Sequence, residues 1–131
     1  NTDDQAKKKA VIGVVEGDTH DIGKNLVKIM METAGFEMYD LGRDVPLDQF
    51  IEKAKEVDAD LICMSTLMTT TMGGMQTVIE KLKDQGIRDK FKVMVGGSPI
   101  SKKFADDIGA EGYSVNAVEA VKVAKELTGI A

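Results

Sequence analysis

The only histidine of the chain, His20, lies in a polar segment where its ring could bind a metal or accept a proton. It follows an apolar run that ends at Val15 and precedes a helical pattern, and loops that join strand to helix are where open α/β sheets bind ligands. Asp18 could accept a hydrogen bond from one ring nitrogen and leave the other nitrogen for a metal. A solvated histidine or a helix cap is the alternative interpretation.

The composition disfavours a metal site built from the protein alone. Zinc takes three or four protein ligands, whereas the chain has one histidine and one cysteine, Cys63, inside an apolar run. If His20 binds a metal, we therefore expect the remaining ligands to come with a cofactor. Cys63 itself is predicted to be buried and unreactive.

The composition also excludes several classes of partner. The 131 residues fit a single domain, and the formal net charge of -5 comes without any basic tract, which disfavours nucleic acid and anionic membrane surfaces. The sequence contains no signal peptide and no apolar stretch long enough to span a bilayer. A single cysteine excludes an internal disulfide and favours a reducing, cytoplasmic location.

Apolar runs alternate with helical patterns along the chain, which is typical of a parallel sheet with helices on both faces. Strands are predicted at about 10–15, 36–41, 61–64, 91–95 and 112–114. Helices are predicted at about 24–34, 46–57, 75–82, 101–107 and 116–127, the last opened by an Asn116 and Glu119 pair that resembles a capping box. The predicted fold is an α/β, Rossmann-like (flavodoxin-like) doubly wound domain with a five-stranded parallel sheet.

The loops argue against the commoner ligands of this scaffold. A Walker phosphate loop has four residues between its glycines, whereas Gly17 and Gly23 have five, and Lys24 is followed by asparagine instead of a hydroxyl residue. The dinucleotide pattern Gly-x-Gly-x-x-Gly is absent. The third strand lacks a phosphoacceptor aspartate at its end, and the carboxylates near His20 would repel a flavin phosphate.

Three loops at the same edge of the predicted sheet match one pattern. They are Asp18-x-His20-x-x-Gly23, Ser65-x-Leu67 and Gly96-Gly97, at the ends of the first, third and fourth strands. Across about residues 10–128 they resemble the cobalamin-binding domain, a Rossmann-like module that holds corrinoids in the base-off, His-on state. The resemblance implies a cobalamin (corrinoid, cobalt) cofactor.

The resemblance implies a role for each of these residues. His20 would be the lower axial ligand of cobalt, Asp18 would hold its other ring nitrogen, and Thr71 would hydrogen-bond Asp18. The displaced nucleotide tail would lie in a cleft beside the sheet, next to the Ser65 hydroxyl and against the Gly96-Gly97 pair, where a Cβ would block a flat heterocycle. The implied cofactor-binding residues are Asp18, Thr19, His20, Asp21, Ile22, Gly23, Ser65, Leu67, Thr69, Thr71, Gly96, Gly97 and Tyr113, with His20 as the metal ligand.

Simpler interpretations of the same residues stay open. Ser65, Thr66 and the threonines at 69–71 could be turn and cap residues. The methionines at 64, 68, 72 and 75 are predicted to pack in the core and on a helix face rather than against a corrin ring.

The fuller strings around these motifs, at residues 17–25, 65–72 and 109–113, resemble the corrinoid proteins of methyltransferase systems. The resemblance implies a methyl carrier that is not catalytic alone. A substrate-specific methyltransferase would load the cobalt, and a second methyltransferase would pass the methyl group to an acceptor such as tetrahydrofolate or a thiol, with a reductive activator as a further partner. The alternatives are the cobalamin-binding small subunit of a carbon-skeleton mutase and a cobalamin-responsive regulatory module.

Residues 10–131 are expected to form the cobalamin-binding domain, after a polar lead at residues 1–9. Corrinoid proteins of this kind normally carry an N-terminal helical bundle that caps the upper face of the corrin. The segment 1–9 is too short for such a bundle, and the chain starts with Asn1. Either the bundle was removed or the protein never had one, and we expect a truncated chain.

Overall fold

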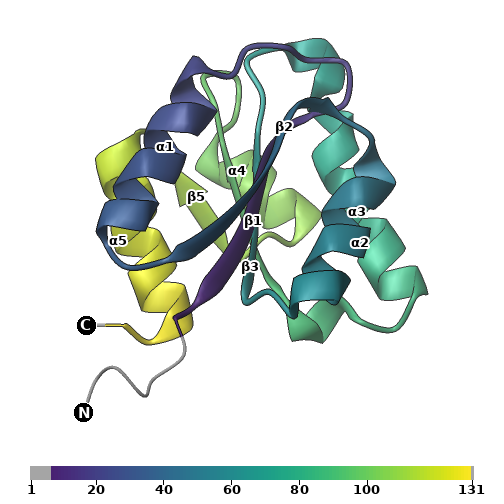
Figure 1. Cartoon of the computed structure of the whole chain (residues 1–131). Coiled ribbons are helices and arrows are strands. Elements are labelled where there is room, and N and C mark those ends of the chain that lie inside the picture. Colours follow the sequence, from purple (N-terminus) through teal and green to yellow (C-terminus); the bar gives the residue numbers. More distant parts are fainter. Residues whose placement is uncertain (1–6, 131) are drawn as a thin grey trace.

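The computed structural model describes residues 7–130, which form one parallel sheet with helices on both faces (Figure 1). The strands are β1 (Lys9–Val15), β2 (Glu37–Val45), β3 (Leu61–Ser65), β4 (Lys92–Gly96) and β5 (Gly112–Ser114). The helices are α1 (Ile22–Thr33), α2 (Leu47–Val57), α3 (Gly73–Asp84), α4 (Lys102–Ile108) and α5 (Ala117–Thr128). Two short 3-10 turns are η2 (Thr69–Thr71) and η3 (Arg88–Lys90).

The strand order is β2-β1-β3-β4-β5 and every neighbouring pair is parallel, which confirms the predicted doubly wound fold. From β1 the sheet grows to β2 on one side and to β3 on the other. The connections that follow β1 and β3 therefore diverge to opposite faces, and the crevice between them is where such sheets bind ligands. His20 lies in the first of these connections.

Each face of the sheet has its own hydrophobic core. Helices α2, α3 and α4 bury Phe50, Met75 and Ile108 on one face. Helices α1 and α5 bury Met31 and Ala120 on the other. Both cores draw on alternate residues of the central strand β1, because successive side chains of a strand point to opposite faces.

The edge strand β2 is longer than predicted and ends at Val45 rather than near residue 41. Its register against β1 shifts twice between Asp40 and Val45, where Gly42 and Asp44 adopt positive φ angles of 91° and 49°. Extra residues of this kind bend a strand and interrupt the alternation of its side chains between the two faces. The alternating sequence pattern therefore stops before the strand ends.

The helix starts differ in detail from the prediction. Helix α1 begins at Ile22, and Pro46 stands before the first turn of α2 instead of inside it. At α5, Asn116 Oδ1 accepts from the Glu119 amide at 2.8 Å, but the Glu119 carboxylate accepts from the amide of Val115, at 3.2 Å. The cap is therefore present, and the return bond of the predicted capping box is shifted by one residue.

The polar lead predicted at residues 1–9 lies mostly outside the described residues, and its last residue, Lys9, is the first of β1. Within residues 7–130, none of the helices is both long and apolar enough to cross a membrane.

Candidate functional site

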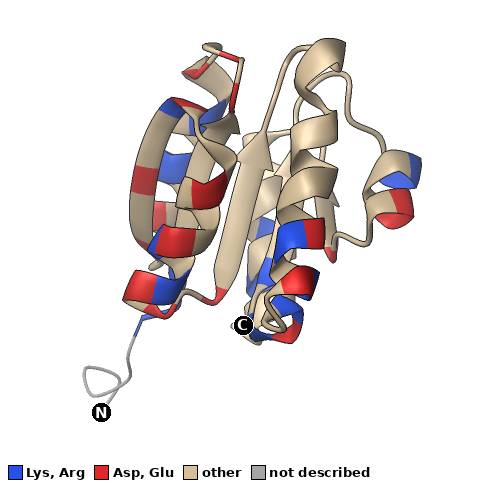
Figure 2. Cartoon of the chain, turned by 90° about the vertical axis from the view of Figure 1, so that its right-hand side faces the viewer, with Lys and Arg blue, Asp and Glu red and all other residues tan. Residues whose placement is uncertain are grey.

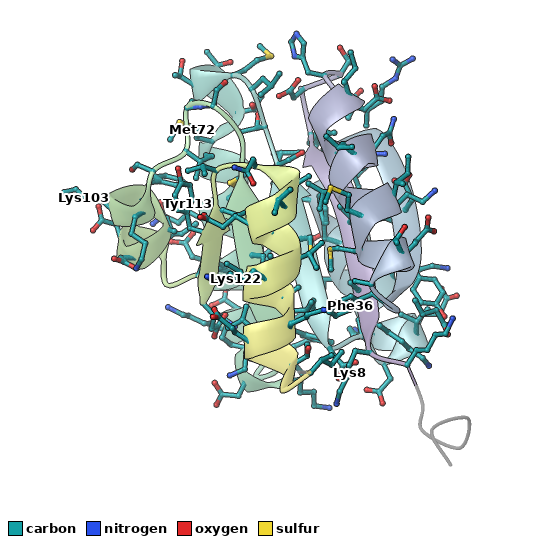
Figure 3. All side chains as sticks on the ribbon, turned by 90° about the vertical axis from the view of Figure 1, so that its left-hand side faces the viewer. Lys8, Phe36, Met72, Lys103, Tyr113 and Lys122 are labelled. Carbon is teal, nitrogen blue, oxygen red and sulfur yellow. The ribbon has the colours of Figure 1, made fainter. Side chains whose placement is uncertain are left out.

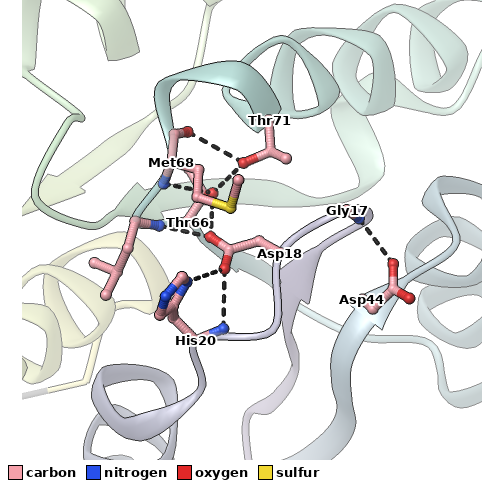
Figure 4. Close-up of polar contacts among 8 residues, drawn as sticks. Gly17, Asp18, His20, Asp44, Thr66, Met68 and Thr71 are labelled. Carbon is pink, nitrogen blue, oxygen red and sulfur yellow. Dashed lines mark hydrogen bonds and ion pairs between the residues drawn. The ribbon is translucent and has the colours of Figure 1, made fainter.

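His20 is presented by the turn that follows β1. The Asp18 amide donates to the Val15 carbonyl at 3.0 Å, and the Asp18 side chain is fully buried. Its Oδ1 accepts from the His20 backbone amide at 2.9 Å and contacts ring Nδ1 at 2.6 Å (Figure 4). The His20 side chain is 55% exposed, so the ring lies at the surface while the carboxylate that it contacts is buried.

The second carboxylate oxygen of Asp18 accepts two further hydrogen bonds, from Thr66 Oγ1 at 2.6 Å and from the Leu67 amide at 2.7 Å. Burial alone would raise the pKa of Asp18, but the hydrogen bonds from Thr66, from two backbone amides and from the His20 ring hold that pKa well below its ordinary value. An ionised carboxylate can only accept, so His20 Nδ1 carries the proton. The other ring nitrogen, Nε2, then keeps a lone pair for a metal.

The prediction that Thr71 hydrogen-bonds Asp18 is wrong, because Thr66 takes that place. Thr66 is 1% exposed, and its hydroxyl contacts both Asp18 and the Thr71 hydroxyl. Thr71 also donates to the Met68 carbonyl at 3.1 Å, at the start of η2. The polar chain therefore runs from Thr71 through Thr66 to Asp18. No spacing rule distinguishes Thr66 from the neighbouring hydroxyl residues in the sequence.

A cavity of about 330 Å³ opens beside His20, between the carboxyl ends of β1, β3, β4 and β5 and the helices α1 and α5. Ser65, Gly96 and Ser114 lie in register across β3, β4 and β5 at its wall, so two hydroxyl residues flank a position without a side chain. The predicted residues that line the cavity are His20, Gly23, Ser65, Leu67, Gly96 and Gly97.

The other predicted residues do not line this cavity: Asp18, Thr19, Asp21, Ile22, Thr69, Thr71 and Tyr113. The Tyr113 hydroxyl donates to the Ile100 carbonyl at 3.1 Å, and its ring packs against the core under α2, α3 and α4. Figure 3 shows Tyr113 on the α4 side of β5. Because strand residues alternate between faces, Tyr113 cannot share the cavity face with Ser114, and the predicted nucleotide contact finds no support in this position.

Several wall residues were not predicted. Most are apolar and come from both helices and the sheet, among them Ile12, Val27, Met94 and Ala120. In the sequence these residues belong only to apolar strand or helix patterns. Such patterns indicate burial but do not show whether a buried residue lines a cavity or packs in a filled core.

Lys24 is another unpredicted wall residue, and its side chain is 2% exposed. Its ammonium donates to both carboxylate oxygens of Asp40, at 2.8 and 2.9 Å, and to Asn25 Oδ1 at 2.6 Å. The buried charge is therefore fully partnered, and it ties the first turn of α1 to β2.

Cys63 also lines the cavity and is buried, as predicted. Burial raises the pKa of its thiol to about 12, so the sulfur stays protonated and weakly nucleophilic at neutral pH. As predicted, Met64 and Met75 are buried in the core and Met72 packs against it, although Met64 also lines the cavity.

The structure gives Gly97 a reason to lack a side chain in addition to the predicted one, which stays a prediction. Its φ is 123°, and a Cβ there would lie 1.8 Å from the Thr66 carbonyl oxygen. The close approach is between the protein's own loops after β3 and β4, whereas the sequence interpretation assigned it to a bound heterocycle. A bulky residue at Gly97 would therefore disturb the loop that carries Thr66, with or without a ligand.

The rim of the cavity over β3, β4 and β5 is uncharged. Residues 61–79, 93–101 and 112–118 contain no Asp, Glu, Lys or Arg, and Figure 2 shows the carboxyl ends of these strands without charged residues. Charges at this edge belong to the connection after β1 and to the end of β2, as at Asp18 and Asp44. The rim therefore suits a large ligand with a neutral periphery.

The family model of the B12 binding domain matches residues 8–122. This chain belongs to the B12-binding domain family. It is 62% identical over 117 residues to the dimethylamine corrinoid protein of Methanosarcina barkeri. The aligned segment covers 89% of this chain and 55% of that protein. The B12-binding domain thus spans little more than half the length of this relative.

Two solved structures agree with this result. The monomethylamine corrinoid protein of Methanosarcina barkeri superposes with a TM-score of 0.89 at 41% identity, covering 92% of this chain and 57% of that one. The methanol:cobalamin methyltransferase complex MtaBC of the same organism gives a TM-score of 0.87 at 32% identity, covering 97% of this chain and 49% of that one. The cofactor of this B12-binding domain is cobalamin.

The residues of the B12-binding domain fit that cofactor. Within residues 7–130 no group of three His, Cys, Asp or Glu side chains could hold a metal ion. The apolar cavity wall with hydroxyls beside Gly96 has the character of a slot for a planar heterocycle with a polar edge.

Proposed function

We propose that this B12-binding domain holds cobalamin with His20 as the lower axial ligand of cobalt, base-off and His-on, and carries a methyl group between two methyltransferases. The observation that carries the proposal is the Asp18–His20 pair beside the cavity. When bound, reduced cobalamin supplies a nucleophilic cobalt that takes up a methyl group from a donor and yields it to an acceptor.

The chain's own residues prepare the ligand before the cofactor arrives. Asp18 keeps the proton of His20 on Nδ1, which leaves Nε2 free to bind. Thr66 and the Leu67 amide hold Asp18 ionised by donating to its second oxygen. The imidazole therefore has one tautomer and one orientation, which lowers the entropy lost on binding.

The cavity is the proposed site of the displaced nucleotide tail. Gly96 leaves space between Ser65 and Ser114, whose hydroxyls can hydrogen-bond the polar edge of a base. On the opposite wall, Ala117 and Ala120 of α5 have small side chains that occupy little of the cavity. Leu67, 48% exposed, stands at the rim, where it can pack against the corrin. Thr19, Asp21, Ile22 and Thr69, on the loops around His20, remain candidates for corrin contact.

The proposed partners are a substrate-specific methyltransferase, a second methyltransferase that transfers to tetrahydrofolate or a thiol, and a reductive activator. Similarity to dimethylamine and monomethylamine corrinoid proteins favours a methylamine as methyl donor. It also favours a methyl carrier over a mutase subunit or a regulatory module. The single buried cysteine fits a reducing, cytoplasmic location.

The axial ligand can be tested with hydroxocobalamin reduced to the Co(II) form on the protein. Because His20 is the only histidine, protein labelled with 15N-histidine is expected to change the nitrogen splitting of the paramagnetic resonance spectrum from a triplet to a doublet. The substitution His20→Ala should abolish the label-dependent doublet and weaken cobalamin binding more than about tenfold. A splitting in the parent protein that does not respond to the histidine label would contradict the assignment.

The carrier role requires a separate measurement. The reduced cobalamin-bound protein is mixed with a dimethylamine:corrinoid or monomethylamine:corrinoid methyltransferase and its substrate, and the cobalt absorption is followed. Methylation with one of these enzymes, and loss of the methyl group on addition of a second methyltransferase with its acceptor, supports the carrier. Tight cobalamin binding with no methyl uptake from either enzyme would favour a regulatory module.

A further inference from the structure

Strand β2 contributes no residue to the cavity wall, yet its end is bonded to the loop that presents His20. The Gly17 amide donates to Asp44 Oδ1 at 2.8 Å (Figure 4), and the Asp44 amide donates to the Asp18 carbonyl at 2.8 Å. A single residue of β2 thus takes one hydrogen bond from, and gives one to, consecutive residues of the loop.

The backbone of Asp44 adopts a conformation that has to be held in place. Its φ is 49°, in the left-handed region that residues other than glycine rarely enter. Such a conformation is strained and persists only where surrounding contacts enforce it. Here it allows the amide and the carboxylate of Asp44 to reach the loop together, on the main chain of Gly17 and Asp18.

Asp18 is therefore held from two strands. Its carboxylate is fixed by Thr66 and Leu67 after β3, and its main chain is fixed by Asp44 at the end of β2. The Asp18–His20 contact depends on both, because the direction of the carboxylate follows from where its backbone lies. Without Asp44, the β3 contacts alone would have to orient the pair.

We propose that Asp44 is a positioning residue for His20: by bonding Gly17 and Asp18 it sets the orientation and tautomer of the imidazole that binds cobalt. The Lys24–Asp40 ion pair fixes the first turn of α1, which follows this loop, to β2. The inference rests on the proposed function only in the identity of the ligand that His20 receives.

The first test uses the protein without cofactor, because its one histidine gives a single imidazole in a long-range 1H–15N spectrum. At a fixed alkaline pH, the parent is expected to hold the neutral ring with the proton on Nδ1. Asp44→Gly keeps the left-handed backbone and the amide bond to Asp18 but removes the carboxylate. It should shift both ring nitrogens toward the Nε2-protonated form that histidine favours in water.

Two further variants make the result specific. Asp44→Asn keeps an Oδ1 acceptor and a side chain that tolerates positive φ, so it is expected to restore the parent spectrum. Asp58→Gly makes the same chemical change at an exposed aspartate with φ of 56°, at the C-terminal end of α2 and the opposite edge of the sheet. It should leave the ring resonances unchanged. A parent-like spectrum in Asp44→Gly, or an equal shift in Asp58→Gly, overturns the proposal.

The second test adds hydroxocobalamin. Asp44→Gly is expected to bind about tenfold more weakly than the parent, since residues that orient a metal ligand typically contribute tenfold or more. Unchanged affinity together with an unchanged ring spectrum rejects the role of Asp44 and leaves His20 ligation intact. Failure of the parent to bind through His20 instead rejects the proposed function, whatever the ring spectrum of the Asp44 variants.

Discussion

Asp18 is the residue on which the site depends. A fully buried carboxylate is costly unless donors surround it, and four donors do so: two backbone amides, the Thr66 hydroxyl and the His20 ring. The same bonds that stabilise the charge also fix the imidazole. Stability and ligand geometry are therefore linked at this residue, and a change in one should be visible in the other.

Asp18→Asn is expected to destabilise the protein at pH 7 by about 1–3 kcal/mol, because the amide cannot accept from all four donors. The pKa of Asp18 is lowered in the folded state. Its stabilising contribution is thus complete above the ordinary aspartate pKa of about 3.9 and is lost as the pH falls below it. Urea unfolding from pH 7 to 3 should show the gap between parent and variant shrinking toward acid.

Asp89→Asn is the control for this series, since Asp89 is exposed on η3. It should differ little from the parent at any pH. A gap between parent and Asp18→Asn that stays constant down to pH 3 would mean that the charge of Asp18 contributes nothing to stability.

The loops after β3 and β4 act as one element because Gly97 packs directly on the Thr66 carbonyl. This contact adjoins the residue whose hydroxyl holds Asp18, so Gly97 supports the site through the protein as well as lining the cavity. The end of β2 supports the site from the other side, through Asp44. The loop that carries His20 is therefore braced by its two neighbouring strands.

Gly97→Ala is expected to destabilise the cofactor-free protein by more than about 3 kcal/mol, since it adds backbone strain to a direct clash with the Thr66 carbonyl. Gly73→Ala, at the start of α3 where a Cβ would meet nothing within 4 Å, should be neutral or slightly stabilising. Thermal unfolding of both variants measures the difference. Equal melting temperatures would show that the β3 and β4 loops can separate without cost.

The cavity belongs to the whole molecule, because it needs the sheet edge and both helices of one layer. Helix α5 approaches closely at Gly112, where a Cβ would lie 2.8 Å from Val123, yet its first turns leave open space beside Ser114. Small residues at Ala117 and Ala120 make that space. The opposite layer, under α2 to α4, is filled by large side chains such as Phe50 and Met75.

Ala117→Leu should therefore fill part of the cavity and lower affinity for hydroxocobalamin by roughly tenfold, equivalent to about 1.4 kcal/mol. Val118→Leu, an exposed change on the neighbouring residue of α5, is the matched control and should bind like the parent. Titration followed by absorption, with melting curves to verify folding, measures both. Full affinity in a folded Ala117→Leu protein would mean that the cofactor does not use this cavity.

Patterns in the chain predicted the strand and helix order because both depend on local periodicity. Parallel strands place their carboxyl ends at one edge, so the sequence alone predicts that His20, Ser65 and Gly96 lie near one another. Element ends were less predictable, as at β2, where a bulge at Gly42 breaks the alternation. Family resemblance added the cofactor, which neither composition nor periodicity indicates.

Local order could not reveal which neighbouring groups meet across the fold. Thr66 and Thr71 are both hydroxyl residues after β3, but it is Thr66 that donates to Asp18. Tyr113 differs from Ser114 by one position and so faces the other core. Asp44 reaches the His20 loop through an irregular backbone that no pattern predicts. Spacing identifies the strand end at which a residue lies, whereas long-range packing selects its face, its rotamer and its partner.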